Sequence, residues 1–344
     1  MADHRDTRHA LLHGGARDVL AERVLLLDGG QATELEKDPR VDLSETCLWS
    51  AALLLERYGS LQEVVTKVHE DYFVSGADAS TTASYQASLE GFQREGVAST
   101  NAEMEQYYAK SVNLAAVARE HVWEKMQKDQ AMRIKPLVAG SLGCYGAALA
   151  DGSEYRGDYG KTPAEIAEWH RHRFAFFAAN KDVDFIIVET IPCLDEVEGI
   201  VQLVNEFPEA RVMIAVACRD GTSLNNGDAI SGLTAIMKKV KNPAQVLAVG
   251  VNCTAPQHVE SLLRSFECES VKLAYPNSGE GWDAVNKKWL PSELAHNGST
   301  PWHVFLPKWY DAGARVFGGC CRTAPVDIQA MREFFQQENR VLEG

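Results

Sequence analysis

The sequence contains no continuous apolar run that approaches the roughly 20 residues needed to cross a bilayer. Its first 23 residues are charged and lack the apolar segment of a secretory signal. We therefore expect no membrane partner and a cytoplasmic protein whose thiols stay reduced. The same segment carries three histidines, which we interpret as part of a solvated arm rather than a metal site: His4, His9 and His13.

Positive charge is also scarce. Lysine and arginine total 34 against 48 aspartates and glutamates, which gives a formal net charge of −14. A broad basic surface for nucleic acid is therefore not expected, and we predict small-molecule substrates instead. No composition break, Gly/Ser-rich linker or internal repeat divides the 344 residues. The sequence leaves the oligomeric state open.

Eight short apolar segments, rich in Val, Ile, Leu and Ala, are present along the chain. They lie at residues 24–28, 77–82, 136–141, 185–190, 212–217, 246–251, 271–275 and 314–318. Such runs are typical of parallel strands that are covered on both faces. Helical patterns separate them, at residues 61–75, 100–127, 164–180, 194–207, 227–240, 255–266, 302–312 and 325–338.

This alternation predicts an α/β fold, a single-domain (β/α)8 TIM barrel over residues 23–340. A flexible arm over residues 1–22 would precede it. A doubly wound sheet is the alternative. One helix start is marked especially clearly, because Thr162-Pro163-Ala164-Glu165 combines an N-cap threonine, proline at the first position and glutamate at the third.

Polar residues and cysteines follow several of the predicted strands. The strand-end sequences are Asp28-Gly29-Gly30, Ser141-Leu142-Gly143, Glu189-Thr190, Asn252-Cys253 and Gly319-Cys320-Cys321. The carboxyl ends of the strands form the active-site face of a (β/α)8 barrel. We therefore expect these residues to meet in one site.

Three of the eight cysteines stand out. Cys253 would follow the sixth strand, and Cys320 and Cys321 the eighth, so their thiols can converge. Soft thiolate ligands select Zn²⁺, and three protein ligands leave the fourth position open, as in catalytic zinc sites. The alternatives are three small buried side chains or a redox switch. The other cysteines are interpreted as ordinary packing residues, although Cys144 lies on a strand-end loop and as a ligand would close the fourth position.

Four of these segments follow one another in a specific order between about residue 24 and about residue 337. They are Asp28-Gly29-Gly30-Gln31-Ala32-Thr33-Glu34-Leu35-Glu36, Glu189-Thr190-Ile191-Pro192, Val251-Asn252-Cys253-Thr254-Ala255-Pro256 and Gly318-Gly319-Cys320-Cys321-Arg322-Thr323. Together they resemble the homocysteine S-methyltransferase family. The resemblance implies a zinc-bearing barrel that methylates the thiol of homocysteine to give methionine. It also implies Cys253, Cys320 and Cys321 as the zinc ligands.

Homocysteine carries an ammonium and a carboxylate besides its thiol. Asp28 and Glu189 are the expected catalytic residues, because they can pair with the ammonium, and the family resemblance fits this role. Backbone amides near Gly29 can bind the carboxylate. We also assign Thr81 and Asn252 to the substrate site. The alternative for each carboxylate is a structural role, capping a helix or holding a loop.

The methyl donor is expected to be a cation, and aromatic faces stabilise cations. Trp49, Tyr85, Tyr145 and Trp282 lie in segments that should reach the barrel mouth, with core packing or a lid contact as the alternative for each. Trp49 and Tyr85 match donor-contacting positions of the betaine-using branch of the family. That branch, however, has a tyrosine directly after the glutamate of the fourth strand, where this chain has Thr190.

Residues 140–159 and 275–280 instead resemble the branch that uses S-methylmethionine or S-adenosylmethionine, with Cys144 in place of its usual proline. Acidic residues of the first segment could attract a cationic donor or form a solvated surface: Asp151, Glu154 and Asp158. We predict zinc-dependent methyl transfer from a sulfonium to homocysteine. The alternatives are a non-catalytic zinc or redox-sensing barrel, a betaine-dependent methyltransferase, and a barrel enzyme whose strand-end carboxylates perform acid–base catalysis.

Overall fold

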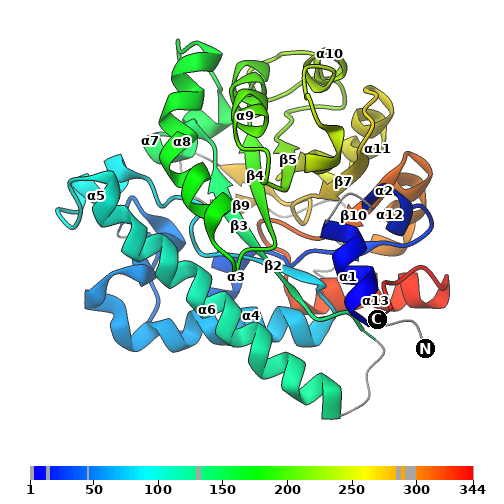
Figure 1. Cartoon of the computed structure of the whole chain (residues 1–344), viewed down its shortest axis with the longest axis horizontal. Coiled ribbons are helices and arrows are strands. Elements are labelled where there is room, and N and C mark those ends of the chain that lie inside the picture. The colour runs from blue at the N-terminus through cyan, green and yellow to red at the C-terminus, as the bar shows by residue number, and fades with distance from the viewer. Residues whose placement is uncertain are drawn as a thin grey trace.

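The computed structural model describes residues 4–12, 16–44, 46–128, 133–283, 288–290 and 300–343. Eight parallel strands form one sheet in the order β1-β10-β7-β6-β5-β4-β3-β2, which wraps into a nearly closed barrel (Figure 1). This order follows the chain around the ring, so the (β/α)8 prediction is confirmed and the doubly wound alternative is wrong. The strands are β1 (Leu25–Leu26), β2 (Ala79–Thr81), β3 (Leu137–Gly143), β4 (Phe185–Ile191), β5 (Val212–Val216), β6 (Val246–Asn252), β7 (Val271–Tyr275) and β10 (Ala314–Phe317).

The seam between β1 and β2 is joined through one buried carboxylate. Asp78 donates its backbone N–H to the Leu26 carbonyl at 2.6 Å, and its Oδ2 accepts the Leu26 N–H at 3.0 Å. Its Oδ1 accepts from Arg332 of the last helix at 2.9 Å. Because both strands are very short, this side chain supplies the connection that a longer strand pair would make with its own backbone.

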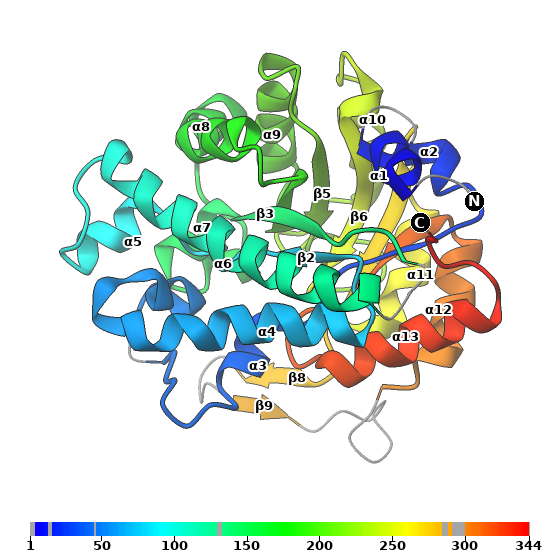
Figure 2. The same cartoon turned by 60° about the horizontal axis from the view of Figure 1, so that its bottom comes forward.

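Helices follow every strand and cover the outside of the barrel. The eight main helices are α4 (Gln62–Ser75), α6 (Asn101–Lys128), α8 (Pro163–Ala179), α9 (Leu194–Glu206), α10 (Leu233–Met237), α11 (Pro256–Arg264), α12 (Trp302–Asp311) and α13 (Pro325–Gln337). Figure 2 shows α4 between α6 and α13, and it contacts both. The predicted start of α8 is confirmed, since Thr162 and Glu165 form a capping box. No helix in the described parts of the chain combines the length and hydropathy that a bilayer crossing requires.

Shorter elements lie in the connections. They are α1 (His4–Leu12), α2 (Ala16–Val19), α3 (Gln31–Leu35), α5 (Leu89–Arg94), α7 (Tyr145–Leu149), the 3-10 helices Trp49–Leu54, Glu56–Leu61, Ser153–Tyr155, Ile230–Gly232 and Pro243–Gln245, and the hairpin of β8 (Gly281–Asp283) and β9 (Lys288–Leu290). The expected aromatic Trp282 lies in β8, and its side chain falls outside the described residues, as do those of His4 and His13.

One predicted helix, over residues 227–240, is shorter in the structure and starts three residues later. The chain leading into it forms isolated antiparallel bridges between Cys218 and Leu224 and between Ser223 and Ala229. Gly227 turns the chain with a φ of 101°, which a helix does not accommodate. Helical structure therefore begins only with the 3-10 turn Ile230–Gly232 and continues as α10.

The hydrophobic core has two layers, because successive strand residues point to opposite faces. Phe185 and Ile187 belong to a cluster inside the barrel, whereas Ile186 and Val188 belong to the larger cluster between strands and helices. Each of the eight strands contributes its inward-facing side chains to the inner cluster, which fills the barrel. The barrel is therefore a packed core whose chemistry has to lie at its mouth.

The N-terminal segment contributes to the inner cluster. Leu11, Leu12 and Leu20 are buried there beside Leu342 from the other end of the chain. Arg8 forms an ion pair with Asp184, just before β4. These contacts place α1 against the barrel core. The division of the chain into an arm over residues 1–22 and a barrel over residues 23–340, and the flexibility of that arm, stay predictions.

Candidate metal and active site

Three thiols converge at the carboxyl ends of two strands. Cys253 directly follows β6, and Cys320 and Cys321 follow β10 after two glycines. The three Sγ atoms lie within 4.8 Å of one another, and those of Cys253 and Cys321 are 3.7 Å apart. Two sulfurs on a tetrahedral zinc with Zn–S bonds of about 2.3 Å are about 3.8 Å apart. The spacing thus suits one tetrahedral metal ion held by thiolates.

The turn after β10 explains how two adjacent cysteines face the same side. A Cβ atom at Gly319 would lie 2.1 Å from the Thr323 hydroxyl, so only glycine allows the chain to approach so closely. Cys320 N–H donates to the Pro276 carbonyl at 2.8 Å, and the Cys321 carbonyl accepts from Ser278 N–H at 3.2 Å. These contacts with the β7 connection hold both cysteines in place.

The three thiols do not titrate alike. Hydrogen bonds with Cys253 and Cys320 hold the pKa of Cys321 well below its usual range. The pKa of Cys253 is raised well above its usual range by its hydrogen bonds with Cys320 and Cys321, and burial adds to this. One of the three therefore favours the thiolate form, and a bound cation would favour it in all three.

Asp28, at the end of β1, is buried and surrounded by hydroxyl and amide donors. Its Oδ2 accepts from the Ser80 hydroxyl at 2.7 Å, from Thr81 N–H at 2.8 Å and from the Thr81 hydroxyl at 3.1 Å. Burial raises the pKa of Asp28 to about 7, against the effect of these donors. Thr81 is thus an immediate partner of Asp28. The backbone at Gly29 is tightly packed, because an added Cβ would lie 2.9 Å from Tyr72 and Thr323.

Glu189, near the end of β4, is the second buried carboxylate of the mouth. Its Oε1 accepts from the Ser141 hydroxyl at 2.5 Å, and its Oε2 accepts from the Tyr275 hydroxyl at 3.3 Å. Burial, followed by the negative charges of Cys320 and Asp28, raises the pKa of Glu189 to about 8. No ion pair to either Asp28 or Glu189 is present among the described residues. Two buried carboxylates without a cation form a site that an ammonium group would fit.

Asn252 links the fourth and sixth strands directly beneath the thiols. Its Oδ1 accepts from Thr190 N–H at 2.8 Å, and its Nδ2 donates to the Thr190 hydroxyl at 2.9 Å. The same Nδ2 lies 3.9 Å from the Cys320 sulfur. The structure thus brings this predicted site residue to the cluster, in a supporting position. Its contact with substrate stays a prediction, as do the substrate roles of the other site residues.

The expected donor aromatics separate into two groups. Trp49 and Tyr85 meet edge to face with centroids 6.2 Å apart, and burial, followed by the charges of Cys144 and Glu154, raises the pKa of the Tyr85 hydroxyl well above its usual range. Tyr145 instead packs against Tyr159 at 5.1 Å and against Trp169 of α8 at 5.0 Å. Tyr145 therefore belongs to a different aromatic group from Trp49 and Tyr85.

Cys144 is buried at the start of α7 and is not part of the three-thiol group. The fourth position of the cluster is therefore not closed by this cysteine. The remaining cysteines are unpaired thiols outside the group as well, in agreement with their interpretation as packing residues: Cys47, Cys193, Cys218 and Cys268.

Sequence reasoning assigned no role to two residues that the structure brings to the mouth, Tyr155 and Tyr275. The Tyr275 hydroxyl donates to Glu189, and Tyr155 lies in the connection that follows β3. Ser141, which also donates to Glu189, stands at a predicted strand end, and Glu154 is one of the acidic residues considered for a cationic donor. Tyr275 is the last residue of its strand, and Tyr155 lies in a loop whose folding the sequence pattern does not indicate.

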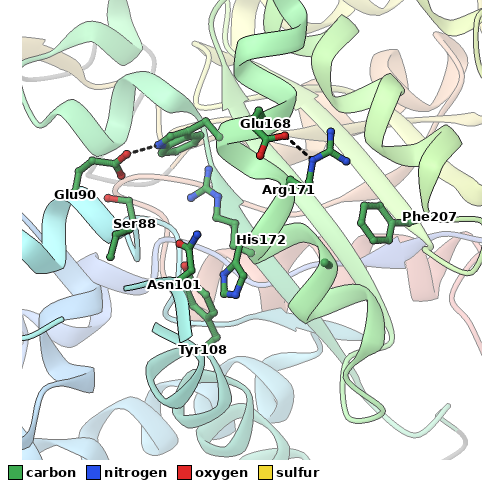
Figure 3. A pocket seen from close by; sticks show the side chains of 12 residues that line it. Ser88, Glu90, Asn101, Tyr108, Glu168, Arg171, His172 and Phe207 are labelled. Carbon is green, nitrogen blue, oxygen red and sulfur yellow. Dashed lines mark hydrogen bonds and ion pairs between the residues drawn. The ribbon is translucent and has the colours of Figure 1, made fainter. Parts of the chain in front are cut away.

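A cavity of about 430 Å³ lies outside the barrel, between α5, α6 and α8 (Figure 3). Figure 3 shows Glu90, Asn101, Tyr108 and His172 around it, with Arg171 paired to Glu168. None of the predicted site residues lines this cavity. It is thus separate from the three-thiol site.

The fold and the site define a (β/α)8 barrel with two buried carboxylates and a cluster of three cysteines that could hold a metal ion at its mouth. The model of the family described as homocysteine S-methyltransferase matches residues 25–335. The chain belongs to this family and is an enzyme of the methyltransferase class.

Similar proteins cover almost the whole chain. The Bacillus subtilis (strain 168) homocysteine S-methyltransferase YbgG is 40% identical over 309 residues, which span 89% of this chain and 92% of that protein. The Escherichia coli (strain K12) homocysteine S-methyltransferase is 39% identical over 313 residues, 90% of this chain and 94% of that protein. The metallated form of the E. coli homocysteine methyltransferase MmuM superposes with a TM-score of 0.76 at 35% identity, covering 92% of this chain and 99% of that one.

Proposed function

We propose that the enzyme transfers a methyl group from a sulfonium donor to the thiol of L-homocysteine, using one Zn²⁺ held by Cys253, Cys320 and Cys321. The observation that carries the proposal is the convergence of these three thiols at the mouth, with one sulfur pair at the 3.7 Å separation that tetrahedral zinc requires. Three cysteine ligands would leave one position for the substrate sulfur. When bound, zinc would stabilise that sulfur as a thiolate, which is the nucleophilic form.

The residues of the chain bind and orient the acceptor. Asp28 and Glu189 pair with the homocysteine ammonium, and each is held in place by two or more donors from neighbouring strands. Binding a cation between them favours their ionised forms and thereby opposes the effect of burial on their pKa values. Backbone groups near Gly29 receive the substrate carboxylate.

The donor supplies both the methyl group and the leaving group. The substrate thiolate attacks the methyl carbon, the carbon–sulfonium bond breaks, and its electron pair converts the sulfonium into a neutral thioether. The acceptor becomes methionine, and the thiol proton is released to solvent. The mouth has to align the two sulfurs on opposite sides of the methyl group, which is a positioning task rather than acid–base work.

A sulfonium is favoured over betaine because Thr190 follows Glu189, and because residues 140–159 match the sulfonium-using branch. S-methylmethionine and S-adenosylmethionine both fit this proposal. The net charge of −14 supports small molecules rather than nucleic acid as partners. The three thiols support work in a reducing compartment, and we propose the cytoplasm.

The test is a product assay with homocysteine and each donor in turn, together with metal analysis of protein purified without chelator. The proposal expects stoichiometric zinc and methionine formation with a sulfonium. Turnover with betaine equal to or above that with S-methylmethionine would contradict the donor assignment. Zinc that excludes homocysteine would point to a closed, redox-sensing site, and metal-free protein with full activity would point to carboxylate catalysis.

A further inference from the structure

The rim of the mouth carries a short 3-10 helix, Ser153–Tyr155, in the connection between β3 and α8. Its backbone is held on two sides. Asn225 Nδ2 donates to the Glu154 carbonyl at 2.9 Å. On the other side it packs on α7, since a Cβ atom at Gly146 would lie 2.5 Å from Glu154 N. The two side chains of Glu154 and Tyr155 are thus presented from a fixed backbone.

Tyr155 lies within range of the charges of the three-thiol cluster. Burial, followed by the negative charges of Cys253 and Cys321, raises the pKa of its hydroxyl. The side chain as a whole remains 47% exposed. It is therefore a partly exposed residue of the rim that the charges of the cysteines reach.

Glu154 is the neighbouring side chain and has an unsatisfied oxygen. Its Oε2 is buried and has no hydrogen-bond partner among the described residues. Burial raises the pKa of Glu154, and its charge in turn acts on Tyr85 and Tyr155. A buried carboxylate oxygen without a donor is costly, so a ligand that supplies positive charge there would be stabilised.

Two arginines of the described residues near the mouth already have carboxylate partners. Arg156, two residues after Glu154, lies 3.7 Å from Asp151 and 3.5 Å from Asp158. Arg322, next to the cysteines, pairs with Glu280 at 2.7 Å. The acidic residues of this loop thus differ in their pairing. Asp151 and Asp158 form ion pairs with the exposed Arg156, whereas Glu154 has a buried oxygen and no ion pair.

We propose that Glu154 is the carboxylate that binds a positive charge of the methyl donor, with Tyr155 forming the wall between that charge and the cysteines. This rests on the proposed function, because it takes the donor to be a sulfonium. S-methylmethionine and S-adenosylmethionine each carry a sulfonium and an ammonium. The chemistry recognised is therefore an organic cation, and the experiment has to decide which of the two positive centres Glu154 binds.

The test is steady-state kinetics of Glu154→Gln, which keeps the shape and removes the charge. We expect the KM for S-methylmethionine to rise about ten- to a hundred-fold, the loss associated with one charge-assisted contact. The KM for homocysteine and the zinc content should stay at the wild-type values. Glu154→Asp should recover part of the donor affinity. Asp158→Asn is the matched control, because this exposed carboxylate pairs with Arg156, and its kinetics should not change.

Dimethylsulfoniopropionate distinguishes the two positive centres, since it keeps the sulfonium and lacks the ammonium. If Glu154→Gln weakens its inhibition as much as it weakens S-methylmethionine, Glu154 binds the sulfonium. If inhibition is unchanged, Glu154 binds the ammonium. An unchanged KM for S-methylmethionine in folded Glu154→Gln overturns this inference alone. Absence of sulfonium turnover in the wild-type enzyme overturns the proposed function as well.

Discussion

Asn252 and Thr190 hold the ends of β6 and β4 together through two reciprocal hydrogen bonds, of 2.8 and 2.9 Å. Thr190 has a φ of 62°, a left-handed conformation that is unfavourable for a β-branched residue. Glu189 precedes Thr190, and Cys253 follows Asn252. This one pair therefore couples the position of the carboxylate proposed to bind substrate to that of a proposed metal ligand.

We expect Asn252→Ala to lower both stability and activity. The change leaves the buried Thr190 N–H without its acceptor, which costs about 1–3 kcal/mol. It also removes the restraint on the left-handed residue, so methyl transfer should fall more than zinc content does. Urea denaturation and turnover measure the two effects.

Asn205→Ala is the control for this prediction. Asn205 also bridges two segments with two hydrogen bonds, to Lys239 O and from Lys241 N, but it is on the surface. Water can replace its contacts, so the loss should be smaller. Equal losses in the two variants would contradict the role assigned to Asn252.

Serine substitutions at Cys253, Cys320 and Cys321 test the metal site. A serine hydroxyl is a poor ligand that stays protonated, so zinc binding should weaken sharply in each variant and methyl transfer should fall at least about a hundred-fold. The circular dichroism spectrum should not change, because the barrel is stabilised by its packed strands and helices. Cys268→Ser is the control, since its thiol lies outside the cluster. Stoichiometric zinc and normal turnover in Cys320→Ser or Cys321→Ser would refute the site.

Asp28→Asn and Glu189→Gln test the binding of the homocysteine ammonium. Each removes one charge from the pair of buried carboxylates, so the homocysteine affinity should drop about ten- to a hundred-fold, which corresponds to roughly 1.5–3 kcal/mol. Zinc should remain bound, because neither carboxylate belongs to the three-thiol group. Calorimetric titration with homocysteine and metal analysis measure these effects. Normal homocysteine binding in both variants would exclude the ammonium role.

The pH dependence of stability should reveal Glu196, a carboxylate away from the cysteines. It accepts from Tyr145 N–H at 2.7 Å and lies 2.8 Å from His170 Nε2. Burial raises the pKa of Glu196 from 4.5 to about 7. Since its folded-state pKa is the higher one, the folded protein holds the proton more tightly, and stability falls as the pH rises from about 4.5 to about 7.

Glu196→Gln removes this titration, so the wild type should lose on the order of 3 kcal/mol relative to the variant across that pH window. Burial lowers the pKa of His170, which lies 2.8 Å from Glu196 and acts in the opposite direction at low pH, so the comparison is made in a His170→Gln background. Glu168→Gln, at an exposed position of α8, should run parallel to the wild type. A constant difference between wild type and Glu196→Gln would contradict the assignment.

The order of strands and helices could be predicted from the sequence because local patterns carry it. All eight strand segments and seven of the eight main helices agree with the structure to within a few residues. The exception, over residues 227–240, begins with Gly227 in a left-handed conformation and Ala229 in an antiparallel bridge to Ser223, which a helical pattern of apolar residues does not reveal. The three-cysteine cluster could also be predicted from the sequence, because the carboxyl ends of all barrel strands meet at one face.

The amino-acid pattern alone is therefore enough to predict the barrel, its alternation of buried and exposed faces, and the residue types at the mouth. Which of these residues come into contact depends on the folded chain. Asn252 forms hydrogen bonds with Thr190, 62 residues away in the sequence. Asp78 connects β1 and β2 through its hydrogen bonds with Leu26 and Arg332. The folded chain also gives the three acidic residues of one loop different environments. Glu154 has a buried oxygen and no ion pair, whereas Asp151 and Asp158 both pair with Arg156. Burial and pairing depend on segments far apart in the chain, so no local pattern can contain them.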